Sequence, residues 1–267
     1  TSIPQRRLWI DSGSFSPDGS QLLTFSGQTL VLRDASSGEA LAAPSFTSSN
    51  FTSARFSSGG DLIVTTDFSN RATVWLPDLR ETASVVTSHN MDVWDVCFSP
   101  SGGCLATASG DGSARLVDLS SSRELASVSH TASVTQVALS PSGEWLATAS
   151  YDGSARLLNV LTGKALTSPM THAGPIGKVA FHPGGELVVT ASHDGTARFW
   201  WTASAEPASP PLPHVGKARA PQFSPDGKLL VTCESAPGRQ VKVWDVEKAC
   251  AGQPPLFCLD IGAGISS

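Results

Sequence analysis

Residues 171–200 read THAGPIGKVAFHPGGELVVTASHDGTARFW, and this stretch decides the fold. A first apolar run ends at Phe181 and is followed by a Pro-Gly-Gly turn. A second run, LVVTAS, leads into the tight turn HDG at 193–195, and a third run ends at Trp200. Proline fixes φ early in such turns, glycine supplies positive φ, and Asp-Gly favours a two-residue type I′ hairpin loop. The stretch therefore predicts three consecutive antiparallel strands joined by tight turns.

The same unit recurs along the whole chain at steps of 41 or 42 residues. Its marker is the last apolar residue before the first turn, which recurs as Phe15, Phe56, Phe98, Leu139, Phe181 and Phe223. A weaker fourth strand follows each unit, and where this strand is rich in proline it suits the edge of a sheet. Four short strands per repeat, with no helical periodicity, are typical of the blades of a β-propeller.

We therefore predict an all-β chain folded as a β-propeller of four-stranded antiparallel blades. Six repeats are visible, and we expect them to form a single domain over residues 1–267. The expected blades span about 6–46, 47–88, 89–129, 130–171, 172–213 and 214–260. Residues 261–267 are expected to be either the start of a further repeat or a closing tail.

The composition excludes several classes of function. The chain has 267 residues and a net charge of −5, which gives no general electrostatic attraction to nucleic acid. No apolar run reaches the length of a membrane span, and the first residues lack a signal-peptide pattern. The five cysteines are odd in number and lack metal-ligand spacing, which indicates reduced thiols. We expect a cytoplasmic protein with neither nucleic acid nor a membrane as its partner.

The repeats resemble WD40 repeats from Arg6 to about Asp260. The run VKVWD at 241–245 contains the Trp-Asp pair itself. That family has a histidine before the first strand, a serine or threonine on the second, an aspartate in the tight turn and a tryptophan on the third. In the family these four side chains form a hydrogen-bonded chain within each blade. The resemblance implies one complete structural tetrad, made of His172, Thr190, Asp194 and Trp200.

The other five repeats depart from this pattern. Two have the first three members and an aliphatic residue in the tryptophan position, namely His89, Thr107 and Asp111 with Val117, and His130, Thr148 and Asp152 with Leu158. The remaining three are more divergent: Thr47, Thr65, Ser69 and Trp75 in the second repeat, His214, Thr232 and Trp244 in the sixth, and Thr24 with Arg6 and Arg33 in the first. The sixth repeat has the insertion SAPGRQ where the aspartate turn is expected.

The resemblance leaves the number of blades open. Members of the family most often have seven blades and close the ring by pairing strands from both termini in one blade. Six repeats therefore predict either a ring that closes by itself or part of a seven-bladed or larger propeller. The Ala-, Gly- and Ser-rich repeats also resemble the WD arrays of large bacterial signalling proteins, in which the propeller is fused to other domains. Such domains would be further partners within the same polypeptide.

Catalytic chemistry finds little support in the sequence. Histidine and aspartate recur periodically, whereas an active site occurs once. A P-loop is absent, and no two histidines or cysteines have metal-ligand spacing. We therefore expect a protein that is not an enzyme and has no cofactor or metal. His182 falls outside the periodic position and is expected to be a solvated turn residue. One enzyme alternative stays open, a site in the central channel that uses Asp95 and His193.

The resemblance implies a non-catalytic scaffold or sensor that binds a protein or peptide. In WD40-like propellers, partners commonly bind the narrower top face, through positions on the first strand and directly before the turn aspartate. Aromatic and arginine side chains dominate such interfaces. The positions that we select here are Trp94, Asp95, Tyr151, His193, Phe68, Lys178, Gln136 and Arg219. Two alternatives stay open: these side chains only cover the rim of the channel, or the chain is a structural assembly unit of a larger multidomain signalling protein.

Overall fold

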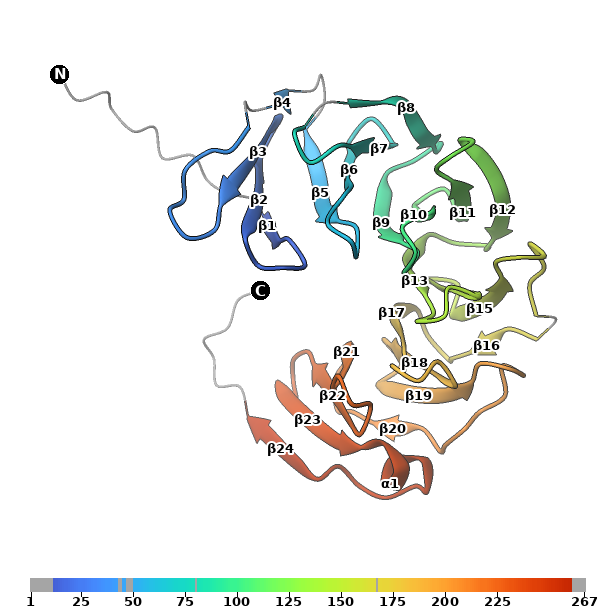
Figure 1. The fold of residues 1–267 in the computed structure, drawn as a ribbon. Coiled ribbons are helices and arrows are strands. Elements are labelled where there is room, and N and C mark those ends of the chain that lie inside the picture. The colour runs from blue at the N-terminus through green and yellow to red at the C-terminus, as the bar shows by residue number, and fades with distance from the viewer. Residues whose placement is uncertain (1–11, 43–44, 47–49, 80, 167, 261–267) are drawn as a thin grey trace.

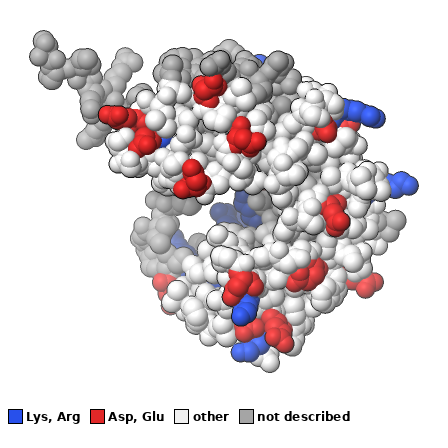
Figure 2. All heavy atoms as spheres, viewed as in Figure 1, with Lys and Arg blue, Asp and Glu red and all other residues white. Residues whose placement is uncertain are grey.

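A computed structural model shows six four-stranded antiparallel sheets arranged side by side around a common centre (Figure 1). The structure describes residues 12–42, 45–46, 50–79, 81–166 and 168–260, and the count of sheets refers to these. In every sheet the strand order follows the chain, so that successive strands are neighbours. The space-filling view shows an opening at the centre (Figure 2). These observations confirm the predicted all-β propeller.

We number the sheets blade 1 to blade 6 in chain order. Blade 1 contains β1 (Ser12–Phe15), β2 (Gln21–Ser26), β3 (Thr29–Asp34) and β4 (Ser45–Phe46). Blade 2 contains β5 (Phe51–Phe56), β6 (Ile63–Asp67), β7 (Arg71–Trp75) and β8 (Glu81–Ser88). Blade 3 contains β9 (Val93–Phe98), β10 (Cys104–Ser109), β11 (Ser113–Asp118) and β12 (Arg123–Ser129).

The second half of the chain repeats this plan. Blade 4 contains β13 (Val134–Leu139), β14 (Trp145–Ser150), β15 (Ser154–Asn159) and β16 (Met170–Thr171). Blade 5 contains β17 (Ile176–Phe181), β18 (Leu187–Ser192), β19 (Thr196–Trp201) and β20 (Leu212–Pro213). Blade 6 contains β21 (Ala218–Phe223), β22 (Leu229–Glu234), β23 (Gln240–Asp245) and β24 (Phe257–Asp260), with the helix α1 (Val246–Cys250) before its last strand. No helix among the described residues is long and apolar enough to cross a membrane.

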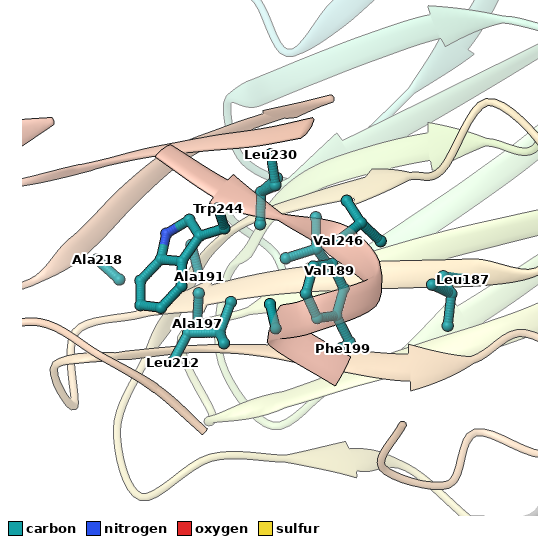
Figure 3. Close-up of a cluster of buried hydrophobic side chains, with 11 residues drawn as sticks. Leu187, Val189, Ala191, Ala197, Phe199, Leu212, Ala218, Leu230, Trp244 and Val246 are labelled. Carbon is teal, nitrogen blue, oxygen red and sulfur yellow. The ribbon is translucent and has the colours of Figure 1, made fainter. Parts of the chain in front are cut away.

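The first strand of each blade lies nearest the centre and the fourth lies at the periphery (Figure 1). Buried apolar side chains form five clusters among the described residues, and each cluster joins two neighbouring blades. Figure 3 shows the cluster between blades 5 and 6, which combines Trp244 and Leu230 of blade 6 with Phe199 and Leu212 of blade 5. The flat faces of the blades are therefore buried against each other, and the loops remain exposed.

The tight turn between the second and third strands differs from the sequence prediction. Gly112 has φ +84° and its N–H donates to the Ser109 carbonyl, whereas Asp111 does not have positive φ. The loop therefore has three residues, 110–112, with glycine in the left-handed region, and the predicted two-residue type I′ turn is wrong. Asp111 stabilises the turn because its Oδ1 accepts hydrogen bonds from the Ser113 N–H at 2.8 Å and the Ser113 hydroxyl at 2.6 Å.

Two glycines with similar backbone conformation provide a test of this turn. A Cβ added to Gly112 would lie 2.9 Å from the His130 carbonyl oxygen, whereas one added to Gly102, at φ +73°, would meet open space. Positive φ costs an L-residue about 1–2 kcal/mol at either site. We expect Gly112→Ala to lower the free energy of unfolding by at least about 1 kcal/mol more than Gly102→Ala does. Urea unfolding measures both variants, and equal losses would contradict the close approach.

Candidate functional site

The tetrad of blade 5 is a continuous hydrogen-bonded chain. His172 Nε2 lies 2.7 Å from Thr190 Oγ1, and its Nδ1 lies 3.0 Å from Asp194 Oδ2. Trp200 Nε1 donates to the same threonine hydroxyl at 2.8 Å. All three contacts are satisfied when the hydroxyl donates to Nε2 and the imidazole carries its proton on Nδ1, facing the carboxylate. Each polar side chain thus uses its hydrogen-bonding capacity within the blade.

The electrostatics of this chain also point to a structural role. Burial lowers the pKa of the His172 imidazole, which keeps it neutral at neutral pH. Burial alone would raise the pKa of the Asp194 carboxyl, but hydrogen bonds, led by that from the Thr196 hydroxyl, lower it overall. A neutral imidazole therefore faces an ionised carboxylate whose oxygens are occupied. Neither group is free to act as a nucleophile or a general base.

Blades 3 and 4 repeat the arrangement without the tryptophan. His89 Nε2 and His130 Nε2 each lie 2.8 Å from the threonine hydroxyl on the second strand. Their Nδ1 atoms lie 3.3 and 3.1 Å from the carboxylates of Asp111 and Asp152. In blade 2, Trp75 Nε1 donates to the Thr65 hydroxyl at 2.8 Å. The predicted first members of blades 1 and 2, Arg6 and Thr47, lie outside the described residues.

Blade 6 supplies the missing carboxylate from a position that the sequence reading overlooked. Glu234 Oε2 accepts a hydrogen bond from the Val215 N–H at 2.9 Å, as Asp194 Oδ2 does from the Ala173 N–H at 3.1 Å in blade 5. Lys242 Nζ lies 3.4 Å from the same glutamate oxygen. The available signal was an acidic residue at the end of β22, where blades 3 to 5 have serine, directly before the inserted residues. Glu234 therefore replaces the turn aspartate at this backbone contact, whereas His214 Nδ1 lies 3.0 Å from the Leu212 carbonyl oxygen.

His182 also differs from expectation. Its side chain is 14% exposed, and its Nδ1 lies 2.7 Å from Glu186 Oε1. Its Nε2 lies 3.0 Å from the Gly227 carbonyl oxygen, and its ring packs edge-to-face on Phe223 at 5.1 Å. Both of these contacts reach from blade 5 to blade 6. The prediction of a solvated turn residue is wrong, because His182 links two blades.

Four aromatic side chains selected from the sequence come from four successive blades. Phe68, Tyr151 and His193 each follow directly on the second strand of blades 2, 4 and 5, and Trp94 lies on β9 in blade 3. The Trp94 and Tyr151 rings meet edge-to-face with centroids 5.6 Å apart, and the Tyr151 and His193 rings lie 5.7 Å apart. We call Trp94, Tyr151 and His193 the aromatic row. Phe68, Trp94 and Tyr151 are 61%, 44% and 43% exposed.

A hollow of about 430 Å³ lies beside this row. Its lining includes Thr52 and Phe68 of blade 2, Asp92 and Trp94 of blade 3, Tyr151 of blade 4 and Lys178 of blade 5. The structure therefore brings four of the selected residues, Phe68, Trp94, Tyr151 and Lys178, around one depression. This volume falls within the usual range for ligand pockets, about 300–1,000 Å³.

Two selected residues have a different role. Asp95 is 3% exposed, its Oδ1 lies 2.9 Å from Arg55 Nη2, and its Oδ2 accepts from the Val137 N–H at 3.3 Å. Gln136 Oε1 accepts from the Val179 N–H at 2.8 Å. Both side chains thus join the first strand of one blade to the first strand of the next. We therefore remove Asp95 and Gln136 from the partner-binding set.

The pair expected for a channel enzyme is not assembled. No hydrogen bond or ion pair joins Asp95 to His193 in the part of the chain that the structure describes. Burial raises the pKa of Asp95, although the guanidinium of Arg55 opposes this effect. Across the same residues, no group of three histidine, cysteine, aspartate or glutamate side chains could hold a metal ion. The arrangement suits binding better than chemistry.

Basic side chains gather next to the aromatic row. Lys178, Lys217 and Arg219 are exposed on blades 5 and 6, and none has an ion-pair partner within the described ranges. Burial, followed by the charges of Lys217 and Arg219, lowers the pKa of His193. Figure 2 shows basic side chains deep in the central opening, while acidic side chains are spread over the face in view.

Comparison with known proteins agrees with the geometry of the blades. A family model described as "WD domain, G-beta repeat" matches residues 80–118, 122–159, 163–200 and 214–245, more than half of the chain. The three complete His–Thr–Asp sets and the Glu234 variant all fall within these matches. No curated protein matches the chain.

Proposed function

This chain belongs to the WD40-repeat family, and we propose that it is a non-catalytic scaffold or sensor module that binds a protein or peptide partner. The proposed binding surface is the top face, by which we mean the side that carries the loops after the second strands. It consists of the hollow and the aromatic row. Arg219 and Lys178, which lines the hollow, place positive charge at the edge of this surface.

The exposed rings around the hollow are the observation that carries this proposal. Phe68, Trp94 and Tyr151 come from different blades, and all three leave much of their surface in water. The interior of the fold does not require them, because the clusters between blades are complete without them. Large aromatic side chains around a concavity are the usual anchors of protein interfaces.

The blades hold this surface in place before a partner arrives. The turn that carries His193 is fixed because Asp194 Oδ2 accepts from the Ala173 N–H and Oδ1 accepts from the Thr196 N–H. The first strands are tied to each other by Asp95 and Gln136. Side chains mounted on such a frame lose little conformational freedom when they bind, which favours affinity.

A selection from a displayed library of random peptides tests the proposal. The bait is the chain itself, and the comparison is the double variant Trp94→Ala with Tyr151→Ala. Because two interface anchors are removed, we expect enriched peptides to bind the double variant at least about tenfold more weakly. The melting temperature should change little, since both side chains are exposed.

The matched control removes exposed apolar side chains elsewhere. Trp201 is 45% exposed and Leu161 is 93% exposed, and neither contributes to the hollow. Trp201→Ala with Leu161→Ala should leave peptide affinity within about twofold of the original chain. Equal binding by the original chain and the folded Trp94/Tyr151 double variant would overturn the assignment of the top face.

A further inference from the structure

We infer that the partner segment is an acidic peptide that carries one large apolar side chain. The apolar side chain enters the hollow beside the aromatic row, and neighbouring carboxylates lie over Lys178, Lys217 and Arg219. We call these three residues the basic triad. The inference rests on the proposed function, because it names the chemistry of the partner at the same surface.

The apolar half of the surface is defined by the hollow. Trp94 and Tyr151 meet edge-to-face, so each ring supports the other while much of its surface stays in water. Phe68 from blade 2 adds a third ring to the lining. A hollow of about 430 Å³ has room for one large side chain with part of its backbone. Covering the rings removes apolar surface from water, which is the main favourable contribution of such an anchor.

The basic half lies toward blades 5 and 6. Lys178 lines the hollow itself, so a carboxylate near it would be close to the anchored side chain. Lys217 and Arg219 flank the start of β21, and both act electrostatically on His193, which touches Tyr151. The strand β21 also packs against β17, which carries Lys178, and β18, which His193 follows, so the basic triad lies next to the aromatic row.

The charges of the basic triad are available to a partner. Two other cations are neutralised within the chain: Arg55 pairs with Asp95, and Lys242 pairs with Glu234. The three cations of the triad form no ion pair among the described residues, and Lys178 acts electrostatically on a buried carboxylate, that of Asp95, which Arg55 already pairs with. Unpaired charges of one sign on an interface attract a partner of the opposite sign and accelerate its association.

The hollow carries opposite charges on its two sides, which orients the bound peptide. Asp92 lines the hollow on blade 3, opposite in charge to Lys178 on blade 5. A carboxylate-bearing segment is attracted at the blade 5 and 6 side and repelled at the blade 3 side. This asymmetry also favours a peptide over a nucleic acid strand, because evenly spaced phosphates would bring negative charge to both sides.

The test is to sequence the peptides that are enriched from the random library and to compare their content of acidic and basic residues. On the original chain we expect enriched sequences to combine a large apolar residue with aspartate or glutamate. On the variant Lys178→Glu, Lys217→Glu and Arg219→Glu, we expect enrichment of basic sequences instead. An acidic peptide selected on the original chain should lose at least about tenfold in affinity on this variant, and raising the ionic strength should weaken its binding to the original chain.

A control variant carries the same change of net charge at a distance. Arg123, Lys164 and Lys228 are exposed, lie outside the lining of the hollow and form no ion pair among the described residues. With all three changed to glutamate, the selected acidic peptide should bind within about twofold of the original affinity. A loss as large as that of the triad variant would attribute the effect to net charge and overturn the inference.

The remaining outcomes separate the inference from the function on which it rests. Enriched peptides that are neutral or basic but depend on Trp94 and Tyr151 would overturn the acidic partner and leave the top-face function standing. Peptides that bind the Trp94/Tyr151 double variant equally well would overturn the function itself. A single-stranded thymidine oligonucleotide serves as the third probe. If it bound the original chain more tightly than the acidic peptide, through the same residues, it would overturn the assignment to a peptide.

Discussion

Replacing Trp200 with alanine is expected to lower the free energy of unfolding by about 3–5 kcal/mol, the largest effect of any single substitution considered. Trp200 is 3% exposed and packs with Val188 of its own blade and Leu157 of blade 4. Its loss leaves a cavity between two blades, and it also removes the indole N–H that donates to Thr190 Oγ1 at 2.8 Å. Chemical unfolding in urea, followed by circular dichroism, measures the change.

The neighbouring residue provides the matched control. Trp201 has the same side chain but points to the other face of β19 and is 45% exposed. Trp201→Ala should therefore cost less than about 1 kcal/mol. Trp200→Phe separates packing from hydrogen bonding, because it retains an aromatic ring and removes the donor, and it should cost about 1–2 kcal/mol. Similar losses for Trp200→Ala and Trp201→Ala would contradict the packing between blades 4 and 5.

Mild acid is expected to destabilise the protein steeply between pH 7 and pH 5. Burial lowers the pKa of four tetrad imidazoles below the ordinary value of 6.5, namely those of His89, His130, His172 and His214. As the pH falls below 6.5, the unfolded chain binds protons that the folded chain does not, so folding becomes less favourable. The stability is complete above pH 6.5 and is lost as the pH falls toward the lowered values. Each histidine contributes up to about 1.4 kcal/mol per pH unit.

The carboxylates of Asp111 and Asp152, which face two of these imidazoles, titrate in a lower window and therefore do not account for this loss. Burial alone would raise the pKa of Asp111 and Asp152, but hydrogen bonds, led by those from Ser113 and Ser154, lower it to about 2 in each case. Their contribution is present above the ordinary value of 3.8 and is lost only as the pH falls from there toward 2. Between pH 7 and 5 they stay ionised in both the folded and the unfolded chain.

Melting temperatures across this range test the assignment. His130→Gln retains hydrogen-bonding capacity and removes one of five histidines with a lowered pKa, the four above and His193, so it should reduce the slope of stability against pH by about a fifth. The comparison uses the slope, which a uniform loss of stability in the variant does not change. A melting temperature that stays constant from pH 7 to pH 5 would contradict neutral, buried imidazoles in the folded state.

The repeat made the blades predictable from the sequence, and the resemblance to WD40 repeats implied the tetrad of blade 5. His172, Thr190 and Asp194 recur at fixed offsets in two other blades, so periodicity alone places them in one strand–turn–strand unit. The same resemblance implied the top-face positions at which the exposed aromatic residues lie. Their meeting around one hollow follows from the arrangement of the blades, which places residues from four repeats next to each other.

Contacts that cross between repeats were harder to predict. Asp95 occupies a position that WD40-like propellers commonly use for partner binding, yet the neighbouring blades cover it and supply its partners. Glu234 was missed because an insertion moves the turn and hides the equivalence to aspartate. His182 was misjudged because its partner Gly227 belongs to the next repeat. The contacts of Asp95 and His182 are made with residues about one repeat away in sequence. Glu234 stands outside the position in the repeat at which the aspartate is expected.

The packing of each blade only against its neighbours determines how the binding surface responds to partial unfolding. Each buried apolar cluster among the described residues joins two neighbouring blades, so local unfolding of one blade, for example blade 6, can stop at the next interface. The hollow is lined by blades 2 to 5 and would survive such an event, whereas Lys217 and Arg219 belong to blade 6. Local unfolding of blade 6 would thus remove the electrostatic attraction of these two cations and leave the apolar hollow intact. The affinity of the module for its partner would then decrease in steps as temperature or acidity rises, before the other blades unfold.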